Sequence, residues 1–254
     1  WSSGIPGDGT TGVADPASTV TGIQNRARYG SDLLFQGADH AGYTGAGDIG
    51  AELLRYNGSA IVLAADINPG TGDSLPQQLT TFGNRLLFSA QTGSGWEQEL
   101  WQWDGTTATE IVLNTTGFSA PSDFVEHDGK LFFVADVDSA PYGDLGRELC
   151  VDDGSSLTVI DVLTGPGGGC YWSDSIQPIN DHKIVFLANG DRGGLPQATG
   201  FEVWESDGTA AGTIFSGLDI RVGTSSGAQQ MIGVIPRSGD DRLLLFGDDA
   251  GTNP

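Results

Sequence analysis

The sequence contains few positive charges and no long apolar segment. Lys and Arg account for 11 of the 254 residues, against 33 Asp and Glu, and the formal net charge is −22. A field of this sign repels phosphate backbones and anionic lipid headgroups, so the composition disfavours nucleic-acid and membrane-surface partners. No apolar run approaches the ~20 residues needed to cross a bilayer, and we therefore expect no insertion into a membrane.

Methionine and histidine are also scarce. The chain begins at Trp1 and its only methionine is Met231, from which we expect a chain that has been processed, excised from a longer protein, or given without a leader such as a signal peptide. The three histidines, His40, His127 and His182, lie far apart in the sequence. Neither the spacing of a metal-binding motif nor a nucleophile elbow occurs, which favours a protein without enzymatic activity.

Glycine, in contrast, is abundant, and it punctuates an internal repeat. Four times an aliphatic and aromatic run is followed, after a loop of variable length, by a strand that begins with Glu and by a tight turn. The four turns are Asn57-Gly58, Asp104-Gly105, Asp153-Gly154 and Asp207-Gly208. Such pairs supply the positive φ angles of two-residue hairpins, so each copy predicts antiparallel strands.

The spacing of the repeat predicts the fold class. Equivalent phenylalanines of consecutive copies lie 45 to 60 residues apart, which is the spacing of β-propeller blades. We predict an all-β fold, a five-bladed β-propeller of four-stranded antiparallel blades. It forms one domain, 1–254, with blades at residues 17–68, 74–114, 119–162, 172–220, and 227–254 together with 1–15. The chain starts and ends at nearly the same point of the repeat, so we expect strands from both termini to close the ring and remove its edges.

The fourth copy carries a resemblance to a known repeat. Residues 202–213 read Glu-Val-Trp-Glu-Ser-Asp-Gly-Thr-Ala-Ala-Gly-Thr, and a Leu-Asp-Ile segment follows. This resembles the Glu-Leu-Trp-x-x-Asp-Gly-Thr-x-x-Gly-Thr repeat of large secreted and cell-surface bacterial proteins, and the match is fullest in this copy. The resemblance implies an extracellular β-propeller module of a secreted or surface assembly, with other proteins of that assembly as partners. It implies no particular reaction, since such scaffolds host varied functions.

Acidic residues gather in the long loops that a four-stranded blade places on one face of the ring. Asp136, Asp138 and Asp144 bring three carboxylates into one short segment. Hard oxygen ligands at this spacing suit Ca²⁺, so these residues are the candidate metal site and Ca²⁺ the candidate cofactor. The alternative is a solvated acidic loop that keeps a secreted protein in solution.

Two other functions remain open. Shallow sites lined by aromatic side chains would make the protein a carbohydrate-binding lectin, for which Trp96 and Trp172 in or beside loops are the candidates, whereas Trp101 and Trp204 are expected to pack between blades. Glycoside hydrolases place paired carboxylates on the inner strands of five-bladed propellers. The inner strands here offer only Asp123 and Asp174, which argues against that enzyme class.

Two further residue sets have structural interpretations. Glu52, Glu99, Glu148 and Glu202 occupy equivalent places in the four copies, which indicates a role in blade packing, because a catalytic pair would be asymmetric. The only two cysteines are Cys150 and Cys170. An even count in an apparently secreted chain predicts a disulfide bond between them.

Overall fold

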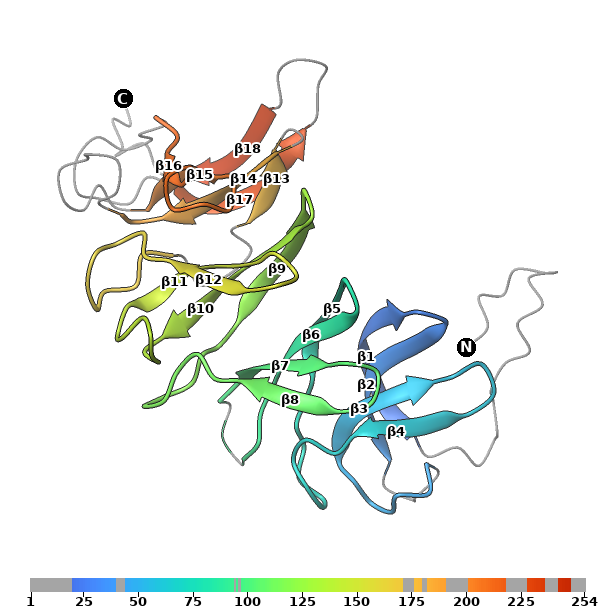
Figure 1. Cartoon of the computed structure of the whole chain (residues 1–254). Helices are drawn as coiled ribbons and strands as arrows, with labels where there is room; N and C mark the ends of the chain where they lie inside the picture. The colour runs from blue at the N-terminus through green and yellow to red at the C-terminus, as the bar shows by residue number, and fades with distance from the viewer. Residues whose placement is uncertain are drawn as a thin grey trace, which may run out of the picture. The chain divides into compact units, whose positions relative to one another are not determined.

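The computed structural model describes residues 20–39, 44–93, 95, 97–170, 176–179, 182–190, 201–217, 228–235 and 242–247. Within these ranges the chain forms β-strands and turns, without a helix that could cross a membrane. The chain divides into two compact units, Trp1–Ile111 and Val112–Pro254, and each unit contains sheets of its own (Figure 1).

The first unit contains two antiparallel four-stranded sheets. Sheet 1 has the order β1 (Val20–Tyr29), β2 (Asp32–Asp39), β3 (Ala51–Tyr56) and β4 (Ile61–Ala65). Sheet 2 has the order β5 (Gln77–Phe82), β6 (Arg85–Ala90), β7 (Glu99–Trp103) and β8 (Ala108–Ile111). Consecutive strands are hydrogen-bonded neighbours in both sheets, as the hairpin turns predict, and β1 lies beside β5.

The second unit repeats this pattern. Sheet 3 consists of β9 (Ser122–His127), β10 (Lys130–Val137), β11 (Gly146–Asp152) and β12 (Leu157–Ile160). Sheet 4 consists of β13 (Gln177–Ile179), β14 (Lys183–Ala188), β15 (Glu202–Ser206) and β16 (Ile214–Phe215). Sheet 5 pairs β17 (Ala228–Ile235) with β18 (Arg242–Gly247), and β17 lies against β13.

The predicted all-β class and the four-stranded antiparallel sheets are therefore confirmed for the first four copies of the repeat. The fifth copy forms a two-stranded sheet in the part of the chain that the structure describes. A ring of five blades, its closure and a single domain stay predictions.

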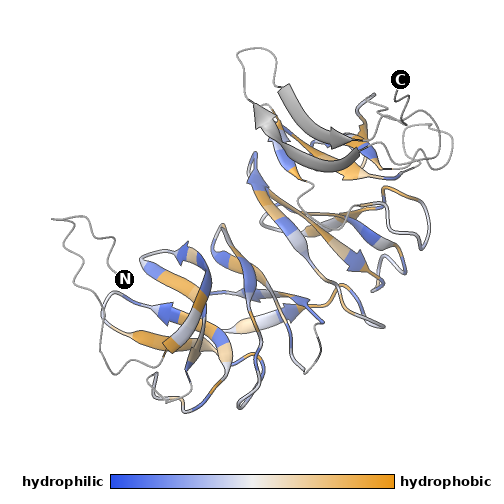
Figure 2. Cartoon of the chain, turned by 180° about the vertical axis from the view of Figure 1, so that it is seen from behind, coloured by the Kyte–Doolittle hydropathy of each residue, from blue (hydrophilic) through white to orange (hydrophobic). Residues whose placement is uncertain are grey.

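The core of the first unit follows from side-chain alternation along the strands. Figure 2 shows hydrophobic segments along the strands, and β2 and β6 are buried at consecutive residues because their apolar side chains point to both faces of the sheet. Leu34 and Leu53 of sheet 1 pack with Leu86 and Trp103 of sheet 2 in one buried cluster. The next residue along β2, Phe35, faces the opposite side of sheet 1. There it forms a second cluster with Ile49 and Leu54, flanked by the half-buried Val20, Leu33, Tyr56, Ile61 and Leu63.

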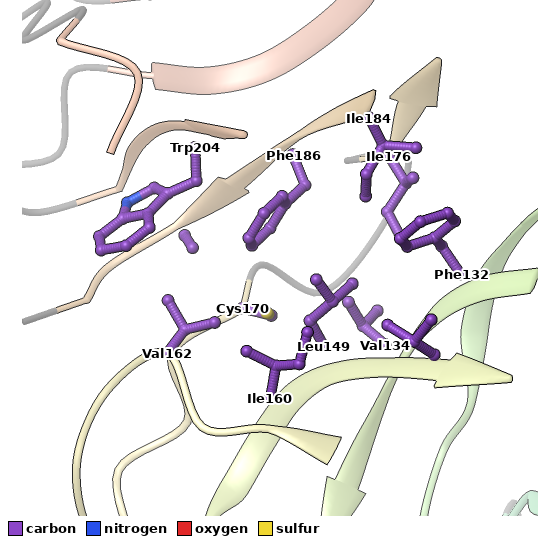
Figure 3. Packing of buried hydrophobic residues seen from close by; sticks show 12 residues of the cluster. Phe132, Val134, Leu149, Ile160, Val162, Cys170, Ile176, Ile184, Phe186 and Trp204 are labelled. Atoms are coloured by element: carbon purple, nitrogen blue, oxygen red, sulfur yellow. The ribbon is translucent and has the colours of Figure 1, made fainter. Parts of the chain in front are cut away.

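An equivalent core lies between sheets 3 and 4. Figure 3 shows Val134 and Leu149 of sheet 3 facing Phe186 and Trp204 of sheet 4. Trp204 is fully buried and makes an edge contact with Phe215 at a ring-centroid distance of 6.3 Å. Sheets 1 and 2 and sheets 3 and 4 are thus stacked face to face by the same alternation of apolar side chains.

Candidate functional site

A buried glutamate near the start of the third strand ties sheet 1 to the segment that leads into sheet 2. Glu52 lies in β3 and is fully buried. Its carboxylate accepts hydrogen bonds from the backbone N–H of Ile67 at 2.8 Å and of Ser74 at 3.0 Å, and from the Ser74 hydroxyl at 2.6 Å. Ser74 precedes β5, so one side chain orients the whole crossing between the two sheets.

Glu148 does the same in sheet 3. Its carboxylate accepts hydrogen bonds from the N–H groups of Val162 at 2.7 Å and Gly169 at 2.8 Å. A side chain at residue 169 would bring its Cβ within 3.0 Å of both carboxylate oxygens, so only glycine allows this close approach. Glu202 of β15 is also fully buried and Glu99 of β7 is half-buried. The structural interpretation is therefore confirmed for Glu52 and Glu148.

The pKa values of Glu52 and Glu148 are both raised well above the ordinary value of a glutamate. Burial raises the pKa of Glu52 to about 7, against the lowering effect of hydrogen bonds from Ser74, Ile67 and Asn68. Burial raises the pKa of Glu148 to about 8, against hydrogen bonds from Val162 and Gly169. Nearby Asp66 and Asp161 add to the rise at the two sites. At each site the loss of hydration therefore raises the pKa of the carboxyl group, and the hydrogen bonds from the chain lower it by a smaller amount.

At the predicted calcium site, the carboxylates contact other groups of the protein. Asp136 lies at the end of β10, where its Oδ2 is 3.5 Å from Nη1 of the buried Arg147. Arg147 also donates to the backbone oxygen of Ala120 at 2.8 Å and to the hydroxyl of Ser122. Burial raises the pKa of Asp136, and the Arg147 guanidinium acts in the opposite direction. Asp136 thus forms an ion pair with Arg147.

Asp138 holds a neighbouring turn. Its carboxylate accepts hydrogen bonds from the N–H and hydroxyl groups of both Thr115 and Thr116. These bonds, the one from the Thr116 hydroxyl foremost, lower the pKa of Asp138. Asp144 is exposed on the same loop. Among the described residues, no three His, Cys, Asp or Glu side chains are grouped so as to hold a metal ion, and calcium binding stays a prediction.

The aromatic candidates divide into two groups. Trp96 and Trp172, the predicted sugar-stacking residues, lie outside the described residues. Trp204 is buried between sheets 3 and 4, and Trp101 packs against the cluster between sheets 1 and 2. The prediction that these two side chains pack between sheets is confirmed.

The predicted disulfide bond is wrong. Cys150 and Cys170 are both free and buried. Cys170 lies in the cluster between sheets 3 and 4, together with Leu149 and Ile160 (Figure 3). Because side chains alternate along β11, Cys150 faces the other side of sheet 3. Burial raises the pKa of both thiols, which keeps them protonated and unreactive.

A feature that the sequence interpretation missed is a bulge in the first strand of successive sheets. Asn25, Gln78 and Asp123 have positive φ angles of 43°, 54° and 62°, and the strand register shifts beside each of them. Bulges of this kind re-aim side chains and recur near binding sites. The repeated Ser-x-Pro segments at Ser74 and Ser119, just before two of the bulges, are the signal that could have indicated them.

Comparisons with known proteins identify no family. No family model matches the sequence, and no curated protein is similar to it. Among solved structures, a putative TolB from Agrobacterium tumefaciens is 14% identical with a TM-score of 0.39, over 85% of this chain and 76% of that one. A chain of the nidogen/laminin complex is 12% identical with a TM-score of 0.39, over 90% of this chain and 72% of that chain. The β-propeller domain of the Trilobed protease from Pyrococcus furiosus is 10% identical with a TM-score of 0.41, over 91% of this chain and 70% of that chain.

Similarities at these TM-scores do not establish a shared fold. The architecture of this chain therefore rests on its own strand pairing, in which four copies of one sequence repeat form four antiparallel four-stranded sheets.

Proposed function

We propose that the chain is a five-bladed β-propeller closed by strands from both termini. Sheets 1 to 4 each use four consecutive strands, whereas β17 and β18 correspond to the first two strands of a repeat. Residues 1–15 carry the sequence expected for the other two.

On this scaffold we infer a non-enzymatic, extracellular module that binds a protein of a secreted or cell-surface assembly. The observation that carries this inference is the repeated buried glutamate. Glu52 and Glu148 hold the crossings that follow sheets 1 and 3 through backbone N–H groups, which gives the loops at that end of these two sheets fixed positions. Loops held on a rigid scaffold are the usual place for binding.

The charges of the described chain support binding rather than catalysis. The carboxylates of Glu52, Glu148 and Asp138 accept hydrogen bonds from their own chain, and Asp136 pairs with Arg147. A formal charge of −22 favours a partner with a basic surface, since complementary fields accelerate encounter and reject partners of like charge.

The test is a binding screen of the full chain against extracellular proteins and a glycan array, with polysaccharide hydrolysis followed in parallel. We expect saturable binding to a protein that weakens with added salt. The exposed Asp144 and Glu126 lie at opposite ends of sheet 3, so they form a matched pair of charge-reversal variants. Asp144→Lys should weaken binding and Glu126→Lys should not.

Each other outcome contradicts part of the proposal. Selective glycan binding would identify a lectin, and turnover of a polysaccharide would identify an enzyme. Equal loss of binding in both variants would mean that net charge, and not the loop end of the sheet, attracts the partner.

A further inference from the structure

Two Asn-Gly pairs occur in the described chain, Asn57-Gly58 and Asn189-Gly190. In such a pair the backbone nitrogen of the glycine can attack the side-chain amide carbon of the asparagine, because no Cβ shields the nitrogen and the backbone is free to rotate. The two pairs consist of the same two residues, so the sequence alone predicts the same reaction at both. Their surroundings in the folded protein differ.

Asn57 lies in the exposed turn between β3 and β4. Its Oδ1 accepts hydrogen bonds from the Ser59 N–H at 3.0 Å, the Ser59 hydroxyl at 2.9 Å and the Ala60 N–H at 3.0 Å. Its Nδ2 and the N–H of Gly58 donate to no described residue. Gly58 has a φ of 93° and no atom within 4 Å of the place where a Cβ would be, so there is room for a ring to form.

Asn189 lies at the end of β14 in a packed environment. Its N–H donates to the backbone oxygen of Gly169 at 2.7 Å. Gly190 is buried, and a Cβ there would be 2.7 Å from both Cζ2 of Trp204 and Cγ1 of Val162. The Oδ1 of Asn189 is buried without a hydrogen-bond donor from the described residues. A ring at this position would displace the aromatic core between sheets 3 and 4.

We propose that Asn57 is a site of spontaneous deamidation in the folded protein and that Asn189 is protected. The nitrogen of Gly58 forms a bond to Cγ of Asn57, the Cγ–Nδ2 bond breaks, and the proton lost by Gly58 leaves with Nδ2 as ammonia. Water then opens the cyclic imide at one of its two carbonyl carbons. The product is aspartate or its β-linked isomer, and water is the only co-reactant.

The turn assists the first step. Negative charge develops on Oδ1 as the nitrogen adds to Cγ, and the three donors from Ser59 and Ala60 already point at that oxygen. Donors aimed at a developing oxyanion stabilise a transition state more than the ground state. The exposed Nδ2, which has no partner to lose, is the leaving group.

The aspartate product fits the same turn. Asp104 and Asp153 occupy the equivalent position in sheets 2 and 3, and each Oδ1 accepts hydrogen bonds at 2.8 Å from the backbone N–H groups two and three residues later. Asn57 makes these same two bonds. Deamidation would therefore convert the one neutral turn of the four into the acidic form that the other copies already have.

The experiment incubates the folded full chain at mildly alkaline pH and follows both Asn-Gly pairs by peptide mass spectrometry after digestion at acidic pH. We expect Asn57 to exchange its amide for a carboxyl group at least about tenfold faster than Asn189, a barrier difference of about 1.4 kcal/mol. In urea the two rates should converge, because the protection of Asn189 depends on the fold.

Variants separate the steps. Ser59→Ala removes one donor to Oδ1 and should slow the reaction at Asn57 without affecting Asn189. Asn57→Asp should co-elute with the aged protein on ion exchange and melt at the same or a higher temperature. Equal rates at the two sites in the folded protein, faster reaction at Asn189, or no reaction at Asn57 would each overturn the proposal.

Discussion

The carboxylate of Asp207 occupies the space in which a side chain of residue 212 would lie. A Cβ at Gly212 would be 2.1 Å from Oδ1 of Asp207. That Oδ1 accepts hydrogen bonds from the N–H and hydroxyl groups of Thr209, and the Thr209 hydroxyl accepts one from the Gly212 N–H. The Asp-Gly-Thr-x-x-Gly-Thr segment of the fourth copy is thus a closed turn in which the second glycine makes room for the aspartate.

Gly212→Ala should therefore destabilise the protein by about 1–3 kcal/mol, the usual cost of forcing atoms into a filled site. Gly93→Ala is the control, since no atom lies within 4 Å of a Cβ there. Chemical denaturation measures both variants. In an Asp207→Ala background the effect of Gly212→Ala should shrink, and an unchanged effect would show that the two residues do not compete for space.

Stability should fall as the pH rises through neutrality. Glu52 and Glu148 have folded-state pKa values of about 7 and about 8, above their ordinary value of 4.5. A raised carboxyl pKa means that the folded state binds the proton more tightly, so this contribution is complete below the ordinary value and is lost as the pH passes the folded values. The free energy of unfolding should thus decrease between about pH 5 and pH 8.

The measurement compares wild type with Glu52→Gln combined with Glu148→Gln over that range. Each substitution replaces a titrating group by a neutral side chain of similar shape, so the free energy of unfolding of the variant should depend less on pH. Parallel curves for the two proteins would show that other groups cause the dependence.

The two thiols should be inaccessible in the folded protein and free in the unfolded one. Cys150 and Cys170 are buried, and burial raises the pKa of both. A thiol-reactive dye should label neither in native buffer and both after denaturation without reductant. Absence of labelling in denaturant would restore the disulfide bond that the sequence predicts.

Calcium binding at the loop of Asp136 and Asp138 predicts a Ca²⁺-specific gain in stability. At a hundredfold excess over Kd the gain would be about 2.7 kcal/mol, and it should vanish when both residues are changed to Asn. Asp138→Asn should weaken the loop even with chelator present, because the carboxylate holds Thr115 and Thr116. Equal thermal shifts from CaCl₂ and from NaCl at matched ionic strength would count against a site.

Closure of the ring predicts that residues 1–15 stabilise the whole chain. Their deletion should lower the melting temperature by more than ~5 °C, because it would leave β18 with an open edge. Replacing the segment by a Gly-Ser sequence of equal length should have the same effect. A melting temperature that stays unchanged in both variants would refute closure.

The sequence by itself determined the secondary structure and the pairing of neighbouring strands. The Asp104-Gly105 turn and the apolar segments at residues 85–90 and 99–103 suffice for this, because hairpins depend on contacts between residues close in the chain. The glutamate repeat by itself also indicates a structural role for Glu52 and Glu148, since a residue present in every copy serves a function that the copies share.

Only the tertiary structure decided what individual polar groups contact. Asp136 and Asp138 are two residues apart, yet one pairs with Arg147 and the other with Thr115 and Thr116. Cys150 and Cys170 lie in neighbouring segments but face different sides of sheet 3. Asn57 and Asn189 are each followed by glycine, but Asn57 lies in an exposed turn and Gly190 is packed against Trp204 and Val162. Such contacts join residues far apart in the chain, and their geometry depends on how sheets stack, which a local sequence pattern does not specify.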